Sequence, residues 1–438
     1  MEWYLLLLLF FGTLFVLMMT GLPVAFGFML INVLAIYLMW GGQIGLGQLT
    51  HSIFESVANF ALLPIPMFVL MGELTYHSGI MFNALSAINK ILGRMPGRLS
   101  LVAVLTGTLL AATTGVSMGT VALLGTSLLP DMRKLGYKNS MSLGPILGSG
   151  GLAIMIPPSN LAVLFAALGQ ISIGAVLMSI IVPGLILSVL YMLYIIIRCS
   201  LQPSLAPSYE TAGLRASEKI MAFVQHVLPI GFIVFMVIGV IFVGIATPSE
   251  AAATGALGCL LLALASRGLN WEMLKKSFLG TLRLTVMIFM IITGAKAFGQ
   301  ALAFSGISSS LIDFVGSLGL SPVLLLIGMV VIMVFLGMFM ECICMMMISI
   351  PLFMPLVHLA GINPIWFAGV LMLSITMAPI SPPFGLDLFT MRGVAPPDIT
   401  MGEIYKAAFP FLVLQALLIG LLIAFPTLVL WLPKMMIG

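Results

Sequence analysis

Residues 154–165 read IMIPPSNLAVLF, and residues 378–389 read APISPPFGLDLF. Each stretch places two adjacent prolines inside a segment that is otherwise apolar enough for a membrane helix. Proline has no backbone N–H, so a tandem proline interrupts the helix and frees carbonyl groups one turn earlier. In a membrane, such backbone is tolerated only where it is buried in protein or lines a cavity. The two stretches therefore predict two broken helices with a functional break in each.

The composition indicates a polytopic membrane protein. The chain has 438 residues, of which 61% are hydrophobic and 7% are charged, and its mean hydropathy is +1.25. A soluble globular protein is about 25% charged. The net charge is only +4, and the basic residues occur singly or in small groups, which excludes a nucleic-acid-binding surface.

Ten apolar segments have the length of about 20 residues that a membrane span needs. They are 3–20, 22–40, 60–76, 140–168, 173–197, 227–246, 248–266, 281–300, 365–390 and 407–432. The first lacks a positive n-region and a cleavage site, so we expect an uncleaved span. Segments 99–129 and 321–352 are interrupted near their middles and predict re-entrant helical hairpins. Segments 43–59, 79–92 and 270–280 mix apolar and polar residues and predict interfacial helices.

The basic residues predict the orientation. With the N-terminus outside and 99–129 as a hairpin, 15 of the 17 Lys and Arg residues fall on the inner side. Lys434 lies outside, and Lys296 lies near the outer end of its helix. If 99–129 were a single span, every later loop would change to the other side of the membrane, and the excess of Lys and Arg on the inner side would be lost. The charge distribution therefore favours the hairpin.

The tandem prolines are part of an internal repeat. At a fixed offset of 225 residues the chain matches itself at Pro130/Pro355, Gly136/Gly361, Gly144/Gly369, Ser149/Ser374, Ala153/Ala378, Pro157/Pro382, Pro158/Pro383 and Leu161/Leu386. On the predicted topology the first hairpin opens inward and the second opens outward, so the two halves are inverted repeats. Inverted repeats with broken helices are typical of secondary transporters, whose binding site lies near the midplane between the breaks.

These observations predict an all-α polytopic membrane protein of two inverted repeats. The first repeat is 1–197, with scaffold helices in 1–92 and a hairpin and broken helix in 99–168. The polar stretch 198–226 is predicted to be a cytoplasmic linker. The second repeat is 227–438, with scaffold helices in 227–300, a hairpin and broken helix in 321–391 and a last span at 407–432.

Polar residues at the hairpin tips and at the breaks are the candidate ion and substrate ligands. The first half supplies Thr113, Thr114, Gly115, Ser117 and Thr120 at the tip, and Ser149, Gly150, Pro157, Pro158, Ser159 and Asn160 at the break. The small tip residues equally suit helix packing in a membrane. The amide of Asn160 needs a partner within its span, which is either a ligand or a structural hydrogen bond.

The second half supplies two acids within apolar segments, Glu341 at the hairpin tip and Asp387 after the break. An acid in the bilayer is a functional-site hypothesis by default, although either one could instead cap a helix N-terminus. Further candidates are Cys342, Thr376, Ser381, Pro382 and Pro383. The hypothesis is two pseudo-symmetric Na⁺ sites with the substrate between them. Their proposed ligands are Ser117, Asn160, Glu341, Thr376 and Asp387.

Other chemistry finds little support in the sequence. No phosphate-binding G-x-x-x-x-G-K-[ST] loop occurs, so ATP is not expected and the energy must come from an ion gradient or a partner. The spacing of Cys342 and Cys344 does not suit a metal site, which indicates buried free thiols. An intramembrane enzyme that uses Glu341 and Asp387 is an alternative, but an inverted repeat has no evident use in hydrolysis.

Six motifs give the chain a resemblance to a known family over essentially its whole length. They are LLPIPMFVLMGEL (62–74), GSGGLAIMIPPS (148–159), GIATPSEAAATGA (244–256), GMFMECICMMMISIPLFMP (337–355), INPIWFAGVL (362–371) and SPPFGLDLFTMRGVAP (381–396). The sequence resembles the large membrane subunit, the DctM type, of tripartite ATP-independent periplasmic (TRAP) transporters.

The resemblance implies an elevator-type secondary transporter of the bacterial inner membrane with a periplasmic N-terminus. It implies Na⁺ as the coupling ion and a small organic anion as the substrate. The implied partners are a soluble periplasmic substrate-binding protein and a small four-helix membrane subunit. A stand-alone ion-coupled carrier of the same fold is the main alternative.

The chain departs from the family pattern at two candidate ligand positions. The first tip reads ATTGVSMGT (112–120) where the family often has Gly-Ser-Ser, and Asp387 stands where the family often has Asn. Glu73 and Lys296 lie at nearly equivalent positions of the two repeats. An ion pair between them within the scaffold is one expectation for these two residues.

Overall fold

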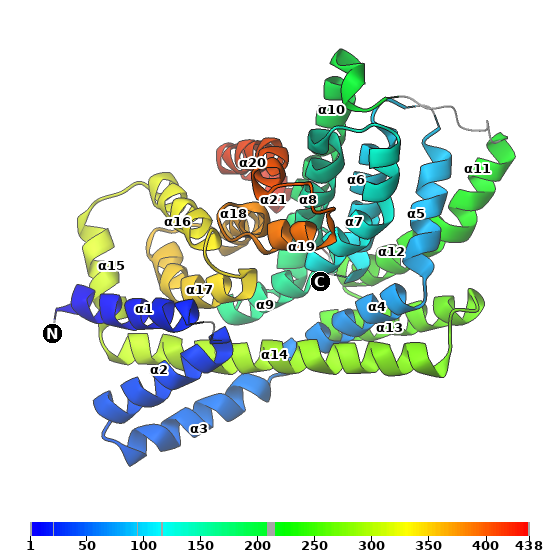
Figure 1. Cartoon of the computed structure of the whole chain (residues 1–438). Coiled ribbons are helices and arrows are strands. Elements are labelled where there is room, and N and C mark those ends of the chain that lie inside the picture. The colour runs from blue at the N-terminus through cyan, green and yellow to red at the C-terminus, as the bar shows by residue number, and fades with distance from the viewer. Residues whose placement is uncertain (1, 21, 94, 115–116, 208–214, 437–438) are drawn as a thin grey trace.

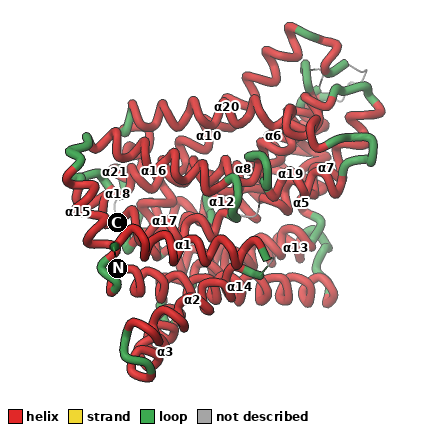
Figure 2. The backbone as a smooth tube through the Cα atoms, turned by 60° about the vertical axis from the view of Figure 1, so that its left-hand side comes forward, coloured by secondary structure: helices red, strands yellow, loops and turns green. Residues whose placement is uncertain are grey.

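The protein is built from helices. The computed structural model describes residues 2–20, 22–93, 95–114, 117–207 and 215–436, and within these ranges it contains 21 α-helices and no strand (Figure 2). Seven helical segments are long and apolar enough to cross a membrane, or eight if the bent pair α8 and α9 counts as one span. The all-α polytopic class is confirmed.

The helices pack in two layers (Figure 1). The α14 layer contains α1 (Trp3–Met19), α2 (Val24–Met39), α3 (Gln43–Val57), α4 (Pro64–His77), α12 (Leu228–Phe242), α13 (Pro248–Ala265) and α14 (Trp271–Phe304). In both views α14 runs along this layer and α3 stands out from the rest of the molecule (Figures 1 and 2). The short helices α5 (Ile80–Ile91), α11 (Ala216–Ala222) and α15 (Ile307–Ser317) lie at the ends of the molecule.

The second layer, the hairpin layer, holds the elements with predicted interruptions. It contains α6 (Arg98–Thr114), α7 (Ser117–Lys134), α8 (Asn139–Met155), α9 (Asn160–Gly169), α10 (Ile173–Leu201), α16 (Pro322–Gly337), α17 (Cys342–Leu359), α18 (Pro364–Met377), α19 (Leu386–Val394), α20 (Met401–Ala424) and α21 (Thr427–Lys434). Helix α8 lies at its centre and is buried from Met141 to Met155. Close contacts explain its glycines: a Cβ on Gly148 would lie 2.4 Å from the ring of Phe411.

Both predicted hairpins and both predicted breaks are present. Helices α6 and α7 pack against each other, as do α16 and α17. Helices α8 and α9 meet at a bend of 43° around a cis Pro157–Pro158 bond. Helix α18 passes through a 3₁₀ turn at Ala378–Ile380 and a cis Pro382–Pro383 bond before α19 begins.

The two halves share helix boundaries. Helices α7 and α17 end 225 residues apart, and α8 and α18 begin 225 residues apart. In each of these turns the chain passes through a glycine with positive φ, 79° at Gly136 and 65° at Gly361. Glycine adopts this conformation without a Cβ penalty. The repeat in the sequence is thus a repeat of helix and turn positions.

Two segments differ from the prediction. The span expected at 407–432 is two helices, α20 and α21, because Pro426 cannot donate the next helical hydrogen bond. The interfacial helix expected at 270–280 and the span expected at 281–300 form one helix, α14, of 34 residues. Asn270 caps its start by accepting a hydrogen bond from the Met273 N–H (2.8 Å). No proline follows within α14 to interrupt it.

Helices also extend into both ends of the stretch 198–226 that was predicted to be a linker. Helix α10 continues to Leu201, and a 3₁₀ turn follows at Pro203–Leu205. Helix α11 passes through a π-helical turn, Phe223–Val227, directly into α12. The second half of the predicted linker is therefore part of a long helix.

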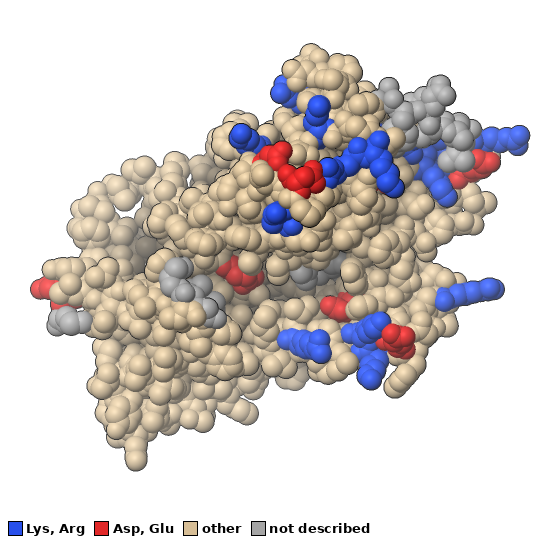
Figure 3. Space-filling model, in the orientation of Figure 1, with Lys and Arg blue, Asp and Glu red and all other residues tan. Residues whose placement is uncertain are grey.

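The charged side chains are unevenly distributed. On the face shown in Figure 3, Lys and Arg gather toward the end of the molecule that carries α5 and α11. The opposite end, which carries α1 and α15, is almost free of them on this face. We call the first end the basic end.

Candidate functional site

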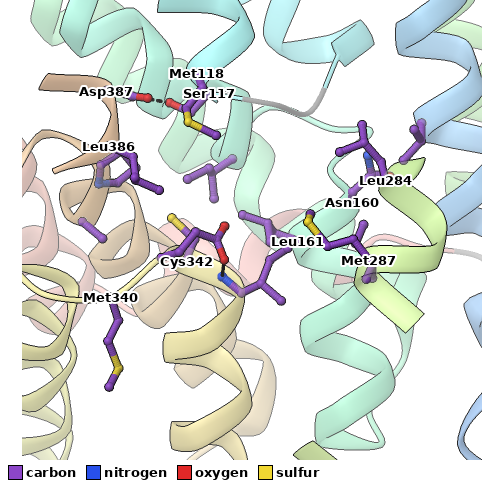
Figure 4. Close-up of a pocket in the computed structure, with 17 residues that line it drawn as sticks. Ser117, Met118, Asn160, Leu161, Leu284, Met287, Met340, Cys342, Leu386 and Asp387 are labelled. Atoms are coloured by element: carbon purple, nitrogen blue, oxygen red, sulfur yellow. Dashed lines mark hydrogen bonds between the residues drawn. The ribbon is translucent and has the colours of Figure 1, made fainter. Parts of the chain in front are cut away.

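A cavity of about 130 Å³ lies between the two layers. The described residues that line it come from both hairpins, both breaks and two helices of the α14 layer. Five of the predicted site residues meet there: Ser117, Asn160, Cys342 and Asp387, which Figure 4 labels, and Glu341. The sequence separates these residues by up to 270 positions, and the fold brings them to one place.

Four helices begin at this cavity. Ser117, Asn160, Cys342 and Leu386 are the first residues of α7, α9, α17 and α19, and all four line it. The first N–H groups of a helix have no partner within the helix, and the helix dipole adds partial positive charge at that end. The cavity therefore presents several positive helix ends without any basic side chain among its described lining residues.

Asp387 is fully buried in the first turn of α19. Its Oδ2 accepts a hydrogen bond from the Ser117 hydroxyl, so the second break is joined to the tip of the first hairpin (Figure 4). Its Oδ1 has no hydrogen-bond partner within the described structure. A buried carboxylate with one free oxygen and no basic neighbour is a group that a bound cation would stabilise.

Gly150 explains how these groups come so close together. A Cβ on Gly150 would lie 2.7 Å from Asp387 Oδ2 and 2.8 Å from Ser117 Oγ. Helix α8 can therefore pass directly behind the Ser117–Asp387 hydrogen bond only because residue 150 has no side chain. Gly150 contributes space for the site, and it does not line the cavity.

Glu341 caps a helix and lines the cavity at the same time. It is the N-cap of α17, where its carboxylate accepts a hydrogen bond from the Ile343 N–H (3.0 Å). The Cys344 thiol lies 3.7 Å from the same oxygen. Glu341 therefore has the predicted capping role, and its carboxylate still lies at the cavity wall.

Asn160 supplies the polar group of the first break. Ser159 caps α9 by accepting from the Ala162 N–H (3.4 Å), and this places Asn160 at the first position of the helix. Asn160 is 7% exposed, and its side-chain Oδ1 has no hydrogen-bond partner within the described structure. Its amide oxygen is therefore a second free acceptor at the cavity.

The α14 layer contributes an apolar wall. Val69 of α4 and Leu284, Met287 and Ile288 of α14 are its lining residues from this layer, and all four are apolar. These residues could not be predicted from the sequence, because an apolar side chain in a span carries no signal that separates a cavity wall from a lipid-facing surface. All the polar and acidic lining residues thus belong to the hairpin layer.

Several predicted site residues lie away from the cavity. The hydroxyls of Ser149, Thr376 and Ser381 donate to carbonyls of their own helical segments, at Ile146, Leu373 and Met377. Pro157, Pro158, Pro382 and Pro383 form the breaks without lining the cavity, and Thr120 lines a second cavity. Gly115 and the side chains of Thr113 and Thr114 lie outside the described residues.

Gln415 of α20 is a polar residue near the second break that was not among the predicted site residues. It is fully buried, and its Nε2 approaches the Thr376 carbonyl (3.5 Å) behind the second break. A lone amide within a predicted span is a signal that was available, because such a group needs a partner. Gln415 supports the backbone at the end of α18.

We expect Thr376→Val to leave the Na⁺ dependence of transport within about twofold of the wild type, because the Thr376 hydroxyl bonds its own helix and makes no cavity contact. The measurement is the half-saturating Na⁺ concentration for uptake into proteoliposomes. A large increase would show that the hydroxyl turns toward the ion during transport.

The comparisons with known proteins agree with this architecture. A family model described as "Tripartite ATP-independent periplasmic transporter, DctM component" matches residues 11–428. The chain is 30% identical over 390 residues to the C4-dicarboxylate TRAP transporter large permease protein DctM of Pseudomonas aeruginosa, covering 88% of this chain and 89% of that protein. It is 26% identical to the ectoine TRAP transporter large permease protein TeaC of Halomonas elongata, covering 96% and 97%.

A solved structure shows the same fold at low sequence identity. The YdaH transporter of Alcanivorax borkumensis matches with a TM-score of 0.62 and 16% identity, covering 88% of this chain and 89% of that one. Both of these sequence relatives are named as permeases, and the protein is a transport subunit and not an enzyme. The family model covers nearly the whole chain, and the protein therefore belongs to the DctM component family of the tripartite ATP-independent periplasmic transporters.

Proposed function

We propose that this chain is the substrate-translocating subunit of a Na⁺-coupled transporter that imports a small organic anion. The observation that carries the proposal is the cavity itself, in which two hairpin tips and two helix breaks bring together acidic groups, free acceptors and four helix N-termini. This combination suits the joint binding of an anion and a cation.

The helix N-termini support an anionic substrate. Carboxylates bind favourably at helix N-termini, where free N–H groups and the helix dipole both act on them. Neither Lys nor Arg is among the described lining residues, so a substrate carboxylate would rely on neutral donors, and those at the helix N-termini carry partial positive charge.

The acidic groups support a coupling cation. Asp387 and Glu341 place two carboxyl groups in the same cavity, and they would repel an anionic substrate when both are ionised. Na⁺ held by the free oxygens of Asp387 and Asn160 would remove that repulsion. Substrate binding would then depend on the ion, which is the requirement for coupled transport.

The distribution of polarity between the layers supports an elevator mechanism. The polar lining residues belong to the hairpin layer, and the facing wall of Val69, Leu284, Met287 and Ile288 is apolar. The hairpin layer can therefore carry the filled site past that wall without exchanging polar contacts. We propose that the α14 layer stays fixed in the membrane while the hairpin layer moves as one body.

Membership of the family implies a small membrane subunit and a periplasmic binding protein as partners. We propose that the small subunit has four helices and that the soluble binding protein delivers the substrate. The proposed location is the bacterial inner membrane with the N-terminus in the periplasm. The gathering of Lys and Arg at one end of the molecule supports this orientation (Figure 3).

The test is uptake into proteoliposomes that hold this chain with its small subunit, under an imposed Na⁺ gradient. C4-dicarboxylates and ectoine are the first substrates to try, because the names of two relatives specify them. We expect uptake only when both Na⁺ and the cognate binding protein are present. ATP should have no effect in this assay.

Two results would contradict parts of the proposal. Na⁺-driven uptake without a binding protein would identify a stand-alone carrier of the same fold. Uptake that requires the binding protein but does not depend on any ion gradient would contradict the coupling role proposed for Asp387 and Asn160. A matched preparation that carries Asp387→Ala serves as the inactive control.

A further inference from the structure

A second cavity of about 230 Å³ adjoins the first. It lies between α4 and the first hairpin, and its described lining residues include Glu73, Tyr76 and His77 of α4 and Gly119 and Thr120 of α7. His77 Nε2 lies 3.2 Å from Glu73 Oε2, and both side chains are partly exposed, at 26% and 21%. His77 is the only base among the described residues that line either cavity.

Glu73 is held in place by α14. A Cβ on Gly280 would lie 2.4 Å from Glu73 Oε2, so the carboxylate packs directly on the α14 backbone at a residue without a side chain. The Ser277 hydroxyl donates to the Glu73 carbonyl (3.2 Å) from the same helix. The structure thus pairs Glu73 with His77, and not with Lys296 as the repeat suggested.

The two cavities are neighbours along one route. Val69 and Leu284 line both of them. Helix α7 also borders both, with Ser117 and Met118 at the first cavity and Gly119 at the second. The two cavities therefore share part of their walls.

The second cavity lies toward the basic end. Helix α4 runs from Pro64 to His77, with Val69 at the first cavity and His77 near the turn into α5. Figure 1 shows α4 leading toward α5, and Figure 3, in the same orientation, shows Lys and Arg gathered at that end. A substrate that leaves the first cavity in this direction meets His77.

We propose that the second cavity is a release site, in which the imidazole N–H of His77 binds a carboxylate of the departing substrate in exchange for Glu73. The proposal rests on the transport function proposed above and adds the place and the residue for the exit step. Glu73 competes for the same N–H group, so the carboxylate is held only briefly. A release site requires this property, because a tight complex would stop the cycle.

The experiment measures the preference of the second cavity for a carboxylate without using transport. Gly119 lines the cavity and has no atom within 4 Å of an added Cβ, so Gly119→Cys places a thiol there without a clash. The purified chain is alkylated with iodoacetate, which is anionic, or with iodoacetamide, which is neutral. Mass spectrometry of the peptide that contains residue 119 gives both rates. The ratio of the rates cancels changes in thiolate fraction, since both reagents react with the same thiolate.

We expect His77→Ala to lower the iodoacetate to iodoacetamide ratio at Gly119→Cys by about tenfold, which is the size of one hydrogen bond to a charged group. His77→Gln keeps an N–H donor and should lie between His77→Ala and the parent. Glu73→Gln should raise the ratio by removing the competing charge. His51→Ala is the matched control, because His51 is exposed on α3 and lines neither cavity.

Two outcomes would overturn the release site. One is a ratio that His77→Ala leaves unchanged, and the other is a Gly119→Cys thiol that neither reagent reaches. Failure of the transport proposal gives a different result. In that case the ratio would still fall with His77→Ala while uptake by the wild type would be absent.

Discussion

Asp387→Asn is expected to raise the half-saturating Na⁺ concentration by about tenfold, and Asp387→Ala to reduce uptake about a hundredfold. The asparagine keeps the shape of the side chain and an acceptor for the Ser117 hydroxyl, but it removes the charge. The alanine removes both oxygens and leaves the half-buried Ser117 hydroxyl without this partner. The two substitutions therefore separate the charge of Asp387 from its hydrogen bond.

The measurement is initial uptake into proteoliposomes across a series of Na⁺ concentrations. Asp398→Asn is the control, because Asp398 is exposed and lies outside the cavity. The hydrogen bond from Arg133 (2.7 Å) holds the pKa of the Asp398 carboxyl below its usual value. Asp398→Asn should leave the Na⁺ curve unchanged. Wild-type curves for both Asp387 variants would mean that the cation binds elsewhere.

Gly150→Ala is expected to reduce the uptake rate by about tenfold or more, because overpacking of a well-packed interior costs about 1–3 kcal/mol. The added methyl would lie 2.7 Å from Asp387 Oδ2 and 2.8 Å from Ser117 Oγ, and it would push the two groups apart. The third near atom, Val121 Cγ2 at 2.7 Å, leaves it no free direction. The half-saturating Na⁺ concentration should rise together with the loss of rate.

Gly420→Ala is the matched control for this substitution. Gly420 also lies within a helix, α20, and an added Cβ would meet no atom within 4 Å. An alanine there favours the helix by roughly 0.5–1 kcal/mol and should not change uptake. Thermal unfolding of both variants separates a damaged site from a damaged fold. Unchanged uptake by Gly150→Ala would show that the Ser117–Asp387 contact is dispensable.

Much of the fold could be predicted because its signals are local. A tandem proline interrupts a helix in any context, and Gly136 and Gly361 mark the same turn in each half. The break between α20 and α21 at Pro426 and the unbroken α14 were not predicted, because their local signals are weak. One proline near the end of an apolar segment and a few charges near the start of another do not by themselves fix where a helix stops.

The candidate site could be predicted only in part. Ser117, Asn160, Glu341 and Asp387 stood out because each is polar within an apolar segment. The same signal also predicted Thr376 and Ser381 as ligands, but their hydroxyls donate to carbonyls of their own helical segments and do not line the cavity. Which polar groups face the cavity depends on the rotation of each helix against its neighbours, and the apolar composition of these helices gives no face that would fix it.

The hydrogen bond between Ser117 and Asp387 joins residues that lie 270 positions apart in the chain. At a synthesis rate of about 5–20 residues per second, the ribosome needs roughly 14–54 s to reach the second after the first. During that time the first hairpin and Asn160 sit in the bilayer without Asp387. The proposed cation site is therefore incomplete in a nascent chain until residue 387 of 438 has been made, and a translation product interrupted before that point would lack it.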